Sequence, residues 1–176
     1  FGTQLDQANL QLDRKPAAWG LQLDSQQAKG TVNLPDAKGA PIAINLQYVK
    51  LPAVDPTAQA DENAPDPLAD IDPKDIPALD IAINQLFQGP DLVGAWSLKI
   101  RPTAKGLAFN NLNLGLKGMQ LNGAGGWEGA PGASSSWYKG RLDGKNIADV
   151  LKGWGFAPTV TSEDFHRDVD GRWPGS

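Results

Sequence analysis

Apolar residues recur at nearly every second position along much of the chain, with polar or small residues between them. Residues 107–121, which read LAFNNLNLGLKGMQL, show this alternation clearly. A period of two is typical of a β-strand that has one apolar and one polar face. The alternation predicts strands at residues 10–13, 19–24, 31–35, 41–50, 79–83, 95–102, 107–116, 119–123, 135–143 and 165–173.

Some strands carry more detailed expectations. The pair Asn110-Asn111 shifts the parity of the pattern, which favours a β-bulge, and Lys117-Gly118 predicts a hairpin turn. In the strand at 41–50, we expect Tyr48 to share a face with Ile42.

Two segments depart from the strand pattern. Asn146 can cap a short helix over residues 147–152, which Gly153 would end. Residues 52–78 hold six of the fourteen prolines and seven acidic side chains. Because such a segment cannot bury enough surface to offset its ordering entropy, we predict a mobile acidic loop, with pinning of residues 65–75 at the surface as the alternative.

Length and charge limit the class of protein. The 176 residues are expected to form a single β-rich domain, and the ends of the sequence suggest a fragment of a larger protein. The net charge of −4 comes from segment 52–78, since the remainder has 13 acidic and 15 basic residues. Neither the net charge of the whole chain nor that of the remainder fits a nucleic-acid-binding protein. The sequence has no run of about 20 apolar residues, so it predicts no membrane-spanning helix.

The strand pattern produces more apolar surface than one short helix can cover. The alternating faces of five strands present an apolar area on the order of 1,000 Å², whereas soluble monomers tolerate patches of a few hundred Å². Glycines such as Gly94, Gly115 and Gly123 allow a sheet to bend sharply. We therefore predict a mainly β fold, a strongly curved and twisted antiparallel sheet that forms a hydrophobic trough, with one short helix.

An aliphatic trough with few polar anchors suits lipid tails better than polar substrates. We call the side chains expected to line it the predicted groove residues. They are Ile42, Ile44, Leu46, Ile81, Ile83, Trp96, Leu98, Ile100, Leu112, Leu114 and Leu116.

Candidate catalytic and cofactor motifs are incomplete. His166-Arg167-Asp168 lacks the partners of a kinase catalytic loop, and a solvated strand is expected there instead. The segment 123–129 is not followed by a helix, so it predicts a glycine-rich turn and no nucleotide site. With one histidine and no cysteine, no metal site is expected, and we predict neither a cofactor nor an enzyme activity.

The order of several short motifs resembles a known family. They include Asp75–Ile83, Leu92–Leu98, Leu121–Trp127, Val150–Gly155 and Arg172–Ser176. In this order the chain resembles the carboxy-terminal part of the AsmA-like proteins, in the YhdP branch of Gram-negative bacteria.

The resemblance implies a function that agrees with the trough. Such proteins are anchored in the inner membrane, extend through the periplasm as twisted β-sheets and are thought to move phospholipid to the outer membrane. The expected partners are phospholipid acyl chains, the remainder of the same polypeptide and a further periplasmic or outer-membrane protein, with no nucleic acid. The alternative is a structural module, a closed β-sandwich whose apolar face is filled by its own second sheet.

Overall fold

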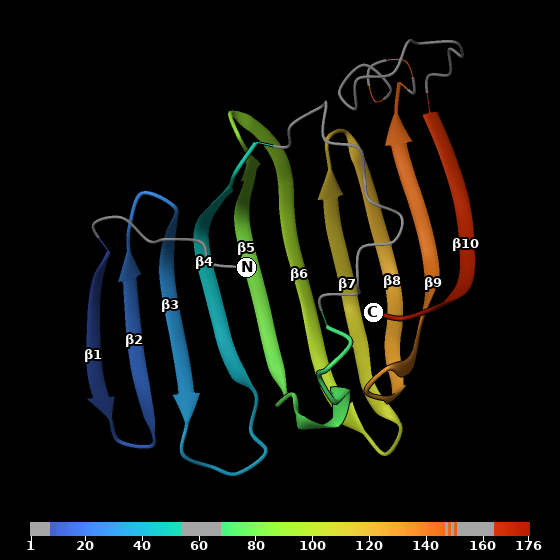
Figure 1. Ribbon diagram of the computed structural model, residues 1–176. Helices are drawn as coiled ribbons and strands as arrows, with labels where there is room; N and C mark the ends of the chain where they lie inside the picture. Colours follow the sequence, from blue (N-terminus) through green and yellow to red (C-terminus); the bar gives the residue numbers. More distant parts are fainter. Residues whose placement is uncertain (1–7, 54–67, 147, 149, 151–163) are drawn as a thin grey trace.

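The chain forms one ten-stranded sheet (Figure 1). The computed structural model describes residues 8–53, 68–146, 148, 150 and 164–176. The strands are β1 (Asn9–Lys15), β2 (Ala18–Asp24), β3 (Ala28–Pro35), β4 (Ile42–Leu51), β5 (Leu79–Gln88), β6 (Asp91–Thr103), β7 (Gly106–Leu116), β8 (Met119–Ala130), β9 (Ala133–Lys145) and β10 (Asp164–Pro174), and one 3₁₀ turn, η1, spans Pro73–Asp75.

The strands lie side by side in the order of the sequence. All neighbouring pairs are antiparallel except β4 and β5, which run parallel. The predicted mainly β fold, a single twisted sheet, is therefore confirmed, with one parallel pair inside it. The described residues contain no second sheet, so the closed sandwich is not the fold of this part of the chain.

The registers place apolar side chains on one side of the sheet. For example, Leu12 pairs with Leu21, and Leu21 pairs with Val32. Because directly paired residues point to the same side, the apolar residues of each strand continue those of the next. We call this side the apolar face and the opposite side the polar face.

The predicted β-bulge in β7 is present. Lys99 pairs with Asn110 while Ser97 pairs with Asn113, and Asn111 has a φ of 50°, in the left-handed region that asparagine tolerates. The extra residue keeps both Phe109 and Leu112 on the apolar face. The predicted hairpin turn at 117–118 is also confirmed, between β7 and β8.

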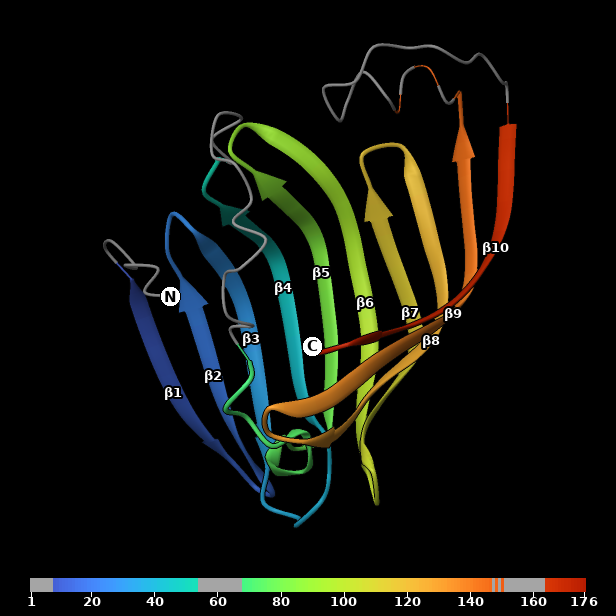
Figure 2. The same cartoon turned by 45° about the vertical axis from the view of Figure 1, so that its right-hand side comes forward.

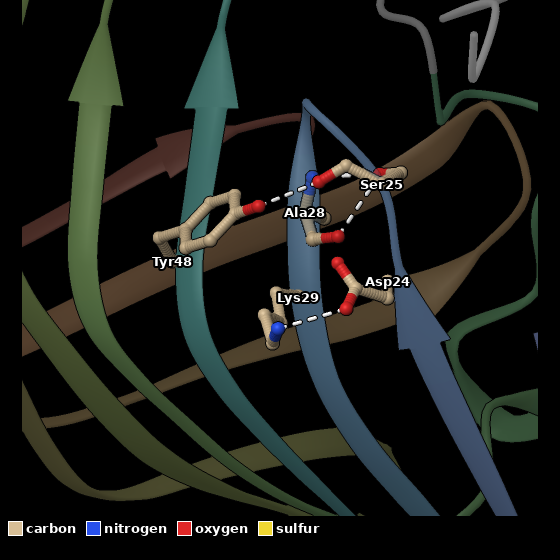
Figure 3. Close-up of polar contacts among 5 residues, drawn as sticks. All are labelled: Asp24, Ser25, Ala28, Lys29 and Tyr48. Atoms are coloured by element: carbon tan, nitrogen blue, oxygen red, sulfur yellow. Dashed lines mark hydrogen bonds and ion pairs between the residues drawn. The ribbon is translucent and has the colours of Figure 1, made fainter. Parts of the chain in front are cut away.

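Tyr48 does not share the face of Ile42, and the prediction that it does is wrong. An irregularity at Lys29/Gly30 pairs Gly30 with Leu46 but Lys29 with Tyr48, which moves Tyr48 to the polar face. Figure 3 shows its hydroxyl donating to the carbonyl of Ser25 at 2.6 Å, beside the Lys29–Asp24 ion pair. The turn between β2 and β3 therefore fixes this tyrosine, which a strict period of two cannot foresee.

The glycine-rich segment 123–129 is not a turn, because β8 runs through it without a break. Its glycines, like those of β9, make room for aromatic rings from neighbouring positions. A Cβ on Gly140 would lie 2.2 Å from the Tyr138 hydroxyl, and one on Gly144 would lie 2.3 Å from the Phe165 ring. Rings that lie over glycines stabilise a strand that glycine alone would weaken.

One end of the apolar face is covered. Figures 1 and 2 show the turn between β8 and β9 beside η1 at the same end of the sheet, and the N–H of Gly132 donates to the carbonyl of Ala69 at 2.8 Å. η1 contacts β6, β7 and β8. Pro73 is fully buried, and Leu107 and Trp127 of the apolar face are only 2% and 3% exposed. A small core therefore closes this end.

Away from that end, no second layer of described residues covers the sheet. On the apolar face Leu10 and Leu12 of β1 are 58% and 60% exposed, and Trp173 of β10 is 45% exposed. These side chains leave the apolar face exposed at both edges of the sheet, which bends across its strands in Figure 2.

Two further predictions fall partly outside the described residues. Of segment 52–78, residues 54–67 lie outside them, so its mobility stays a prediction, whereas η1 packs against the sheet. Of the predicted helix, Ala148 and Val150 are helical and the N–H of Val150 donates to the carbonyl of Asn146 at 3.2 Å. The remainder of that helix lies outside the described residues.

The Arg14–Asp36 pair gives the fold a testable pH dependence. The guanidinium donates to both carboxylate oxygens, at 2.6 and 2.7 Å, and these hydrogen bonds lower the pKa of Asp36. A lowered folded-state pKa stabilises the protein above the unfolded value of about 3.9, and this contribution is lost as the pH falls through the folded value. We expect Asp36→Asn to lower the urea midpoint at pH 7 and to leave it unchanged at about pH 2. An equal loss at both pH values would show that Asp36 acts through packing instead.

Candidate functional site

The predicted groove residues come together on the apolar face of β4 to β7. The pairing brings Ile44 beside Ile81 and Ile81 beside Leu98 in one row across the sheet. A parallel row joins Leu46, Ile83, Trp96 and Leu114. All eleven side chains are half-buried, so each presents part of its surface to the open side of the sheet.

The apolar face also extends beyond the predicted groove residues in both directions. Towards the N-terminus it continues through Leu21, Leu23 and Val32. Towards the C-terminus it continues through a second set on β8, β9 and β10, namely Leu121, Leu142, Phe165 and Val169. The predicted groove residues do not include this second set. Its positions follow the period of two, but glycines stand at several alternate positions of β8 and β9 where an apolar side chain would mark the face.

Side-chain hydrogen bonds link neighbouring strands on both faces of the sheet. The indole N–H of Trp96 donates to the carbonyl of Gly115 at 2.9 Å, which holds the ring against β7. On the polar face, Arg101 donates to Asp80 at 2.6 Å and to the carbonyl of Leu79 at 2.9 Å. Polar side chains thus link β5 to β6 behind the apolar residues.

The histidine motif forms a hydrogen bond across two strands. His166 pairs with Asp143 across β9 and β10, and its hydrogen bond is the main cause of a lowered Asp143 pKa. Asp168 lies on the same polar face, opposite Arg141, in a strand at the edge of the sheet. The sequence expectation of a solvated strand agrees with this placement.

Neither a metal cluster nor a membrane-spanning helix is present in the described part of the chain. It holds no group of three or more histidine, aspartate or glutamate side chains that could bind a metal ion. Within the same residues, no helix has the length and apolar character needed to cross a membrane.

Hollows in the surface lie mostly outside the predicted groove residues. One of about 630 Å³ lies at the ends of β6 to β10, between Leu92, Met119 and His166. Another, of about 420 Å³, lies mainly among polar-face residues such as Asn45, Ser97 and Lys99.

Comparison with known proteins adds one match. A family model described as YhdP protein matches residues 1–176. No curated protein and no solved structure matches the chain.

Proposed function

Since this chain belongs to the YhdP family, we propose that it is a segment of a phospholipid transport protein that holds acyl chains on its apolar face. The protein would work in the periplasm of a Gram-negative bacterium, anchored in the inner membrane and passing lipid towards the outer membrane. The remainder of the same polypeptide would continue the path.

The observation that carries the proposal is the continuous apolar surface without a second layer in the described residues. Eleven half-buried aliphatic and aromatic side chains line β4 to β7, and the charged groups of those strands lie on the other side or at the strand ends. Water in contact with so large an apolar area is unfavourable, at about 25 cal/mol for each Å². Acyl chains would cover this surface without requiring hydrogen bonds from it.

Paired substitutions on one strand test the proposal. Leu114 lies on the apolar face and its neighbour Asn113 on the polar face. We expect Leu114→Asp to reduce bound phospholipid at least about tenfold, because a carboxylate beside an acyl chain has no partner, while Asn113→Asp leaves binding unchanged. Native mass spectrometry after mixing with phosphatidylethanolamine–phosphatidylglycerol vesicles measures the bound lipid.

The same experiment has a clear opposing result. The far-ultraviolet circular dichroism spectrum of Leu114→Asp should match that of the parent chain, because Leu114 is only half-buried. A parent chain that takes up no phospholipid, or a Leu114→Asp variant that takes up as much as the parent, contradicts the proposed function.

A further inference from the structure

A row of paired residues on the apolar face ends at an arginine. From β4 to β10 the row runs through Leu46, Ile83, Trp96, Leu114, Leu121, Leu142 and Arg167. Arg167 lies between Phe165 and Val169, which share its face and are both half-buried. It is the one charged residue in this row, where the alternation calls for another apolar side chain.

Arg167 also differs from the other arginines of the chain, all of which are described. Arg14, Arg101, Arg141 and Arg172 each lie within 4 Å of a carboxylate oxygen. The guanidinium of Arg167 has no such contact and no side-chain hydrogen bond within the described structure, and its side chain is exposed. An arginine on an apolar surface keeps its stem on the surface and directs its guanidinium to water or to an anion.

The spacing of the row fits an acyl chain. Neighbouring strands lie about 4.8 Å apart, so the four steps from Arg167 to Trp96 cover about 19 Å. The hydrocarbon layer of one bilayer leaflet is about 15 Å thick, half of the core of about 30 Å. An acyl chain that starts beside Arg167 can therefore lie on Leu142, Leu121 and Leu114 over its full length.

We propose that Arg167 binds the phosphate of a glycerophospholipid whose acyl chains lie along this row towards Trp96. The guanidinium fork matches the geometry of a phosphate oxygen pair. Since β10 is the edge strand of the described sheet, the headgroup would lie at that edge while the tails cover the apolar face. This inference rests on the proposed function and adds a headgroup position to it.

Competition between two lipids with the same tails tests this inference. Equal amounts of dioleoylphosphatidylglycerol and dioleoylglycerol, which lacks the phosphate, are offered to the chain in micelles of an uncharged detergent, and native mass spectrometry gives the bound ratio. We expect the chain to bind about tenfold more phospholipid than dioleoylglycerol. This ratio corresponds to the smallest contribution that charge-assisted hydrogen bonds usually make. Arg167→Gln should bring the ratio close to one while total bound lipid stays within about twofold, and Arg167→Lys should retain part of the preference.

Arg172→Gln is the matched control, because Arg172 lies on the same strand but pairs with Trp137 of the polar face. It should keep the parent ratio. Addition of inorganic phosphate at about 1 mM should also leave the ratio unchanged, because a phosphate without tails gains nothing from the apolar row. Equal binding of the two lipids by the parent chain, an unchanged ratio in Arg167→Gln, or loss of the preference with free phosphate overturns the inference. Binding of neither lipid would instead contradict the proposed function itself.

Discussion

Leu107→Asp is expected to cause the largest loss of stability of all the proposed substitutions. Leu107 is 2% exposed and pairs with the buried Trp127, at the end of the sheet where η1 packs. An unpaired charge buried there should cost about 3–5 kcal/mol, a large part of the roughly 5–15 kcal/mol that a typical domain has. The measurement is the urea midpoint, followed by tryptophan fluorescence and by circular dichroism.

Leu12→Asp is the control for this experiment, because Leu12 lies on the same face but is 60% exposed. Its unfolding free energy should change by no more than about 0.5 kcal/mol, as for other exposed positions. If Leu12→Asp destabilises the chain as strongly as Leu107→Asp, the apolar face is covered over β1.

The second large effect is expected for Gly140→Ala. A methyl group there would lie 2.2 Å from the carbonyl oxygen of Asn122 and 2.2 Å from the Tyr138 hydroxyl, which itself donates to Asn122 at 2.9 Å. The backbone oxygen cannot move without breaking the β8–β9 pairing, so we expect a loss of about 2–3 kcal/mol. Thermal unfolding followed by circular dichroism in the far ultraviolet should show a lowered midpoint.

Gly171→Ala provides the comparison on the neighbouring strand. Gly171 pairs with Tyr138, yet a Cβ there meets nothing within 4 Å. Since alanine restricts the unfolded chain, this variant should be as stable as the parent or more stable by up to about 1 kcal/mol. Equal losses of unfolding free energy in Gly140→Ala and Gly171→Ala would contradict this explanation. They would mean that both positions need the backbone freedom of glycine, and that the space filled by Tyr138 is not the cause.

Much of this fold could be predicted because a strand reveals itself locally. The alternation around Ile42–Leu46 and Trp96–Ile100 depends only on which residues are neighbours in the chain, and the registers preserve it across the sheet. The bulge at Asn110-Asn111 was visible for the same reason, since a change of parity needs an extra residue. The predicted groove residues followed from that parity alone.

Other features depend on contacts between distant residues, which a periodic pattern does not contain. Tyr48 changes face because of a pairing with Lys29 in another strand. The glycines of 123–129 suggested a turn because their stabilising partners, such as Tyr138 and Phe109, come from neighbouring strands. The isolation of Arg167 from carboxylates likewise became visible only with the registers and the ion pairs.

The parallel pair β4–β5 has a consequence for how the protein folds. Every other neighbouring pair consists of consecutive antiparallel strands, and most are joined by connections far shorter than residues 52–78. To pair Ile42 with Leu79, in contrast, the chain must close the whole segment 52–78 into a loop. Closing this loop costs conformational entropy before the β4–β5 contacts can form and offset it. β1–β4 and β5–β10 are thus two meanders that can each assemble from nearest neighbours. We expect the β4–β5 pairing that joins the two meanders to form after the antiparallel pairs that are joined by short turns.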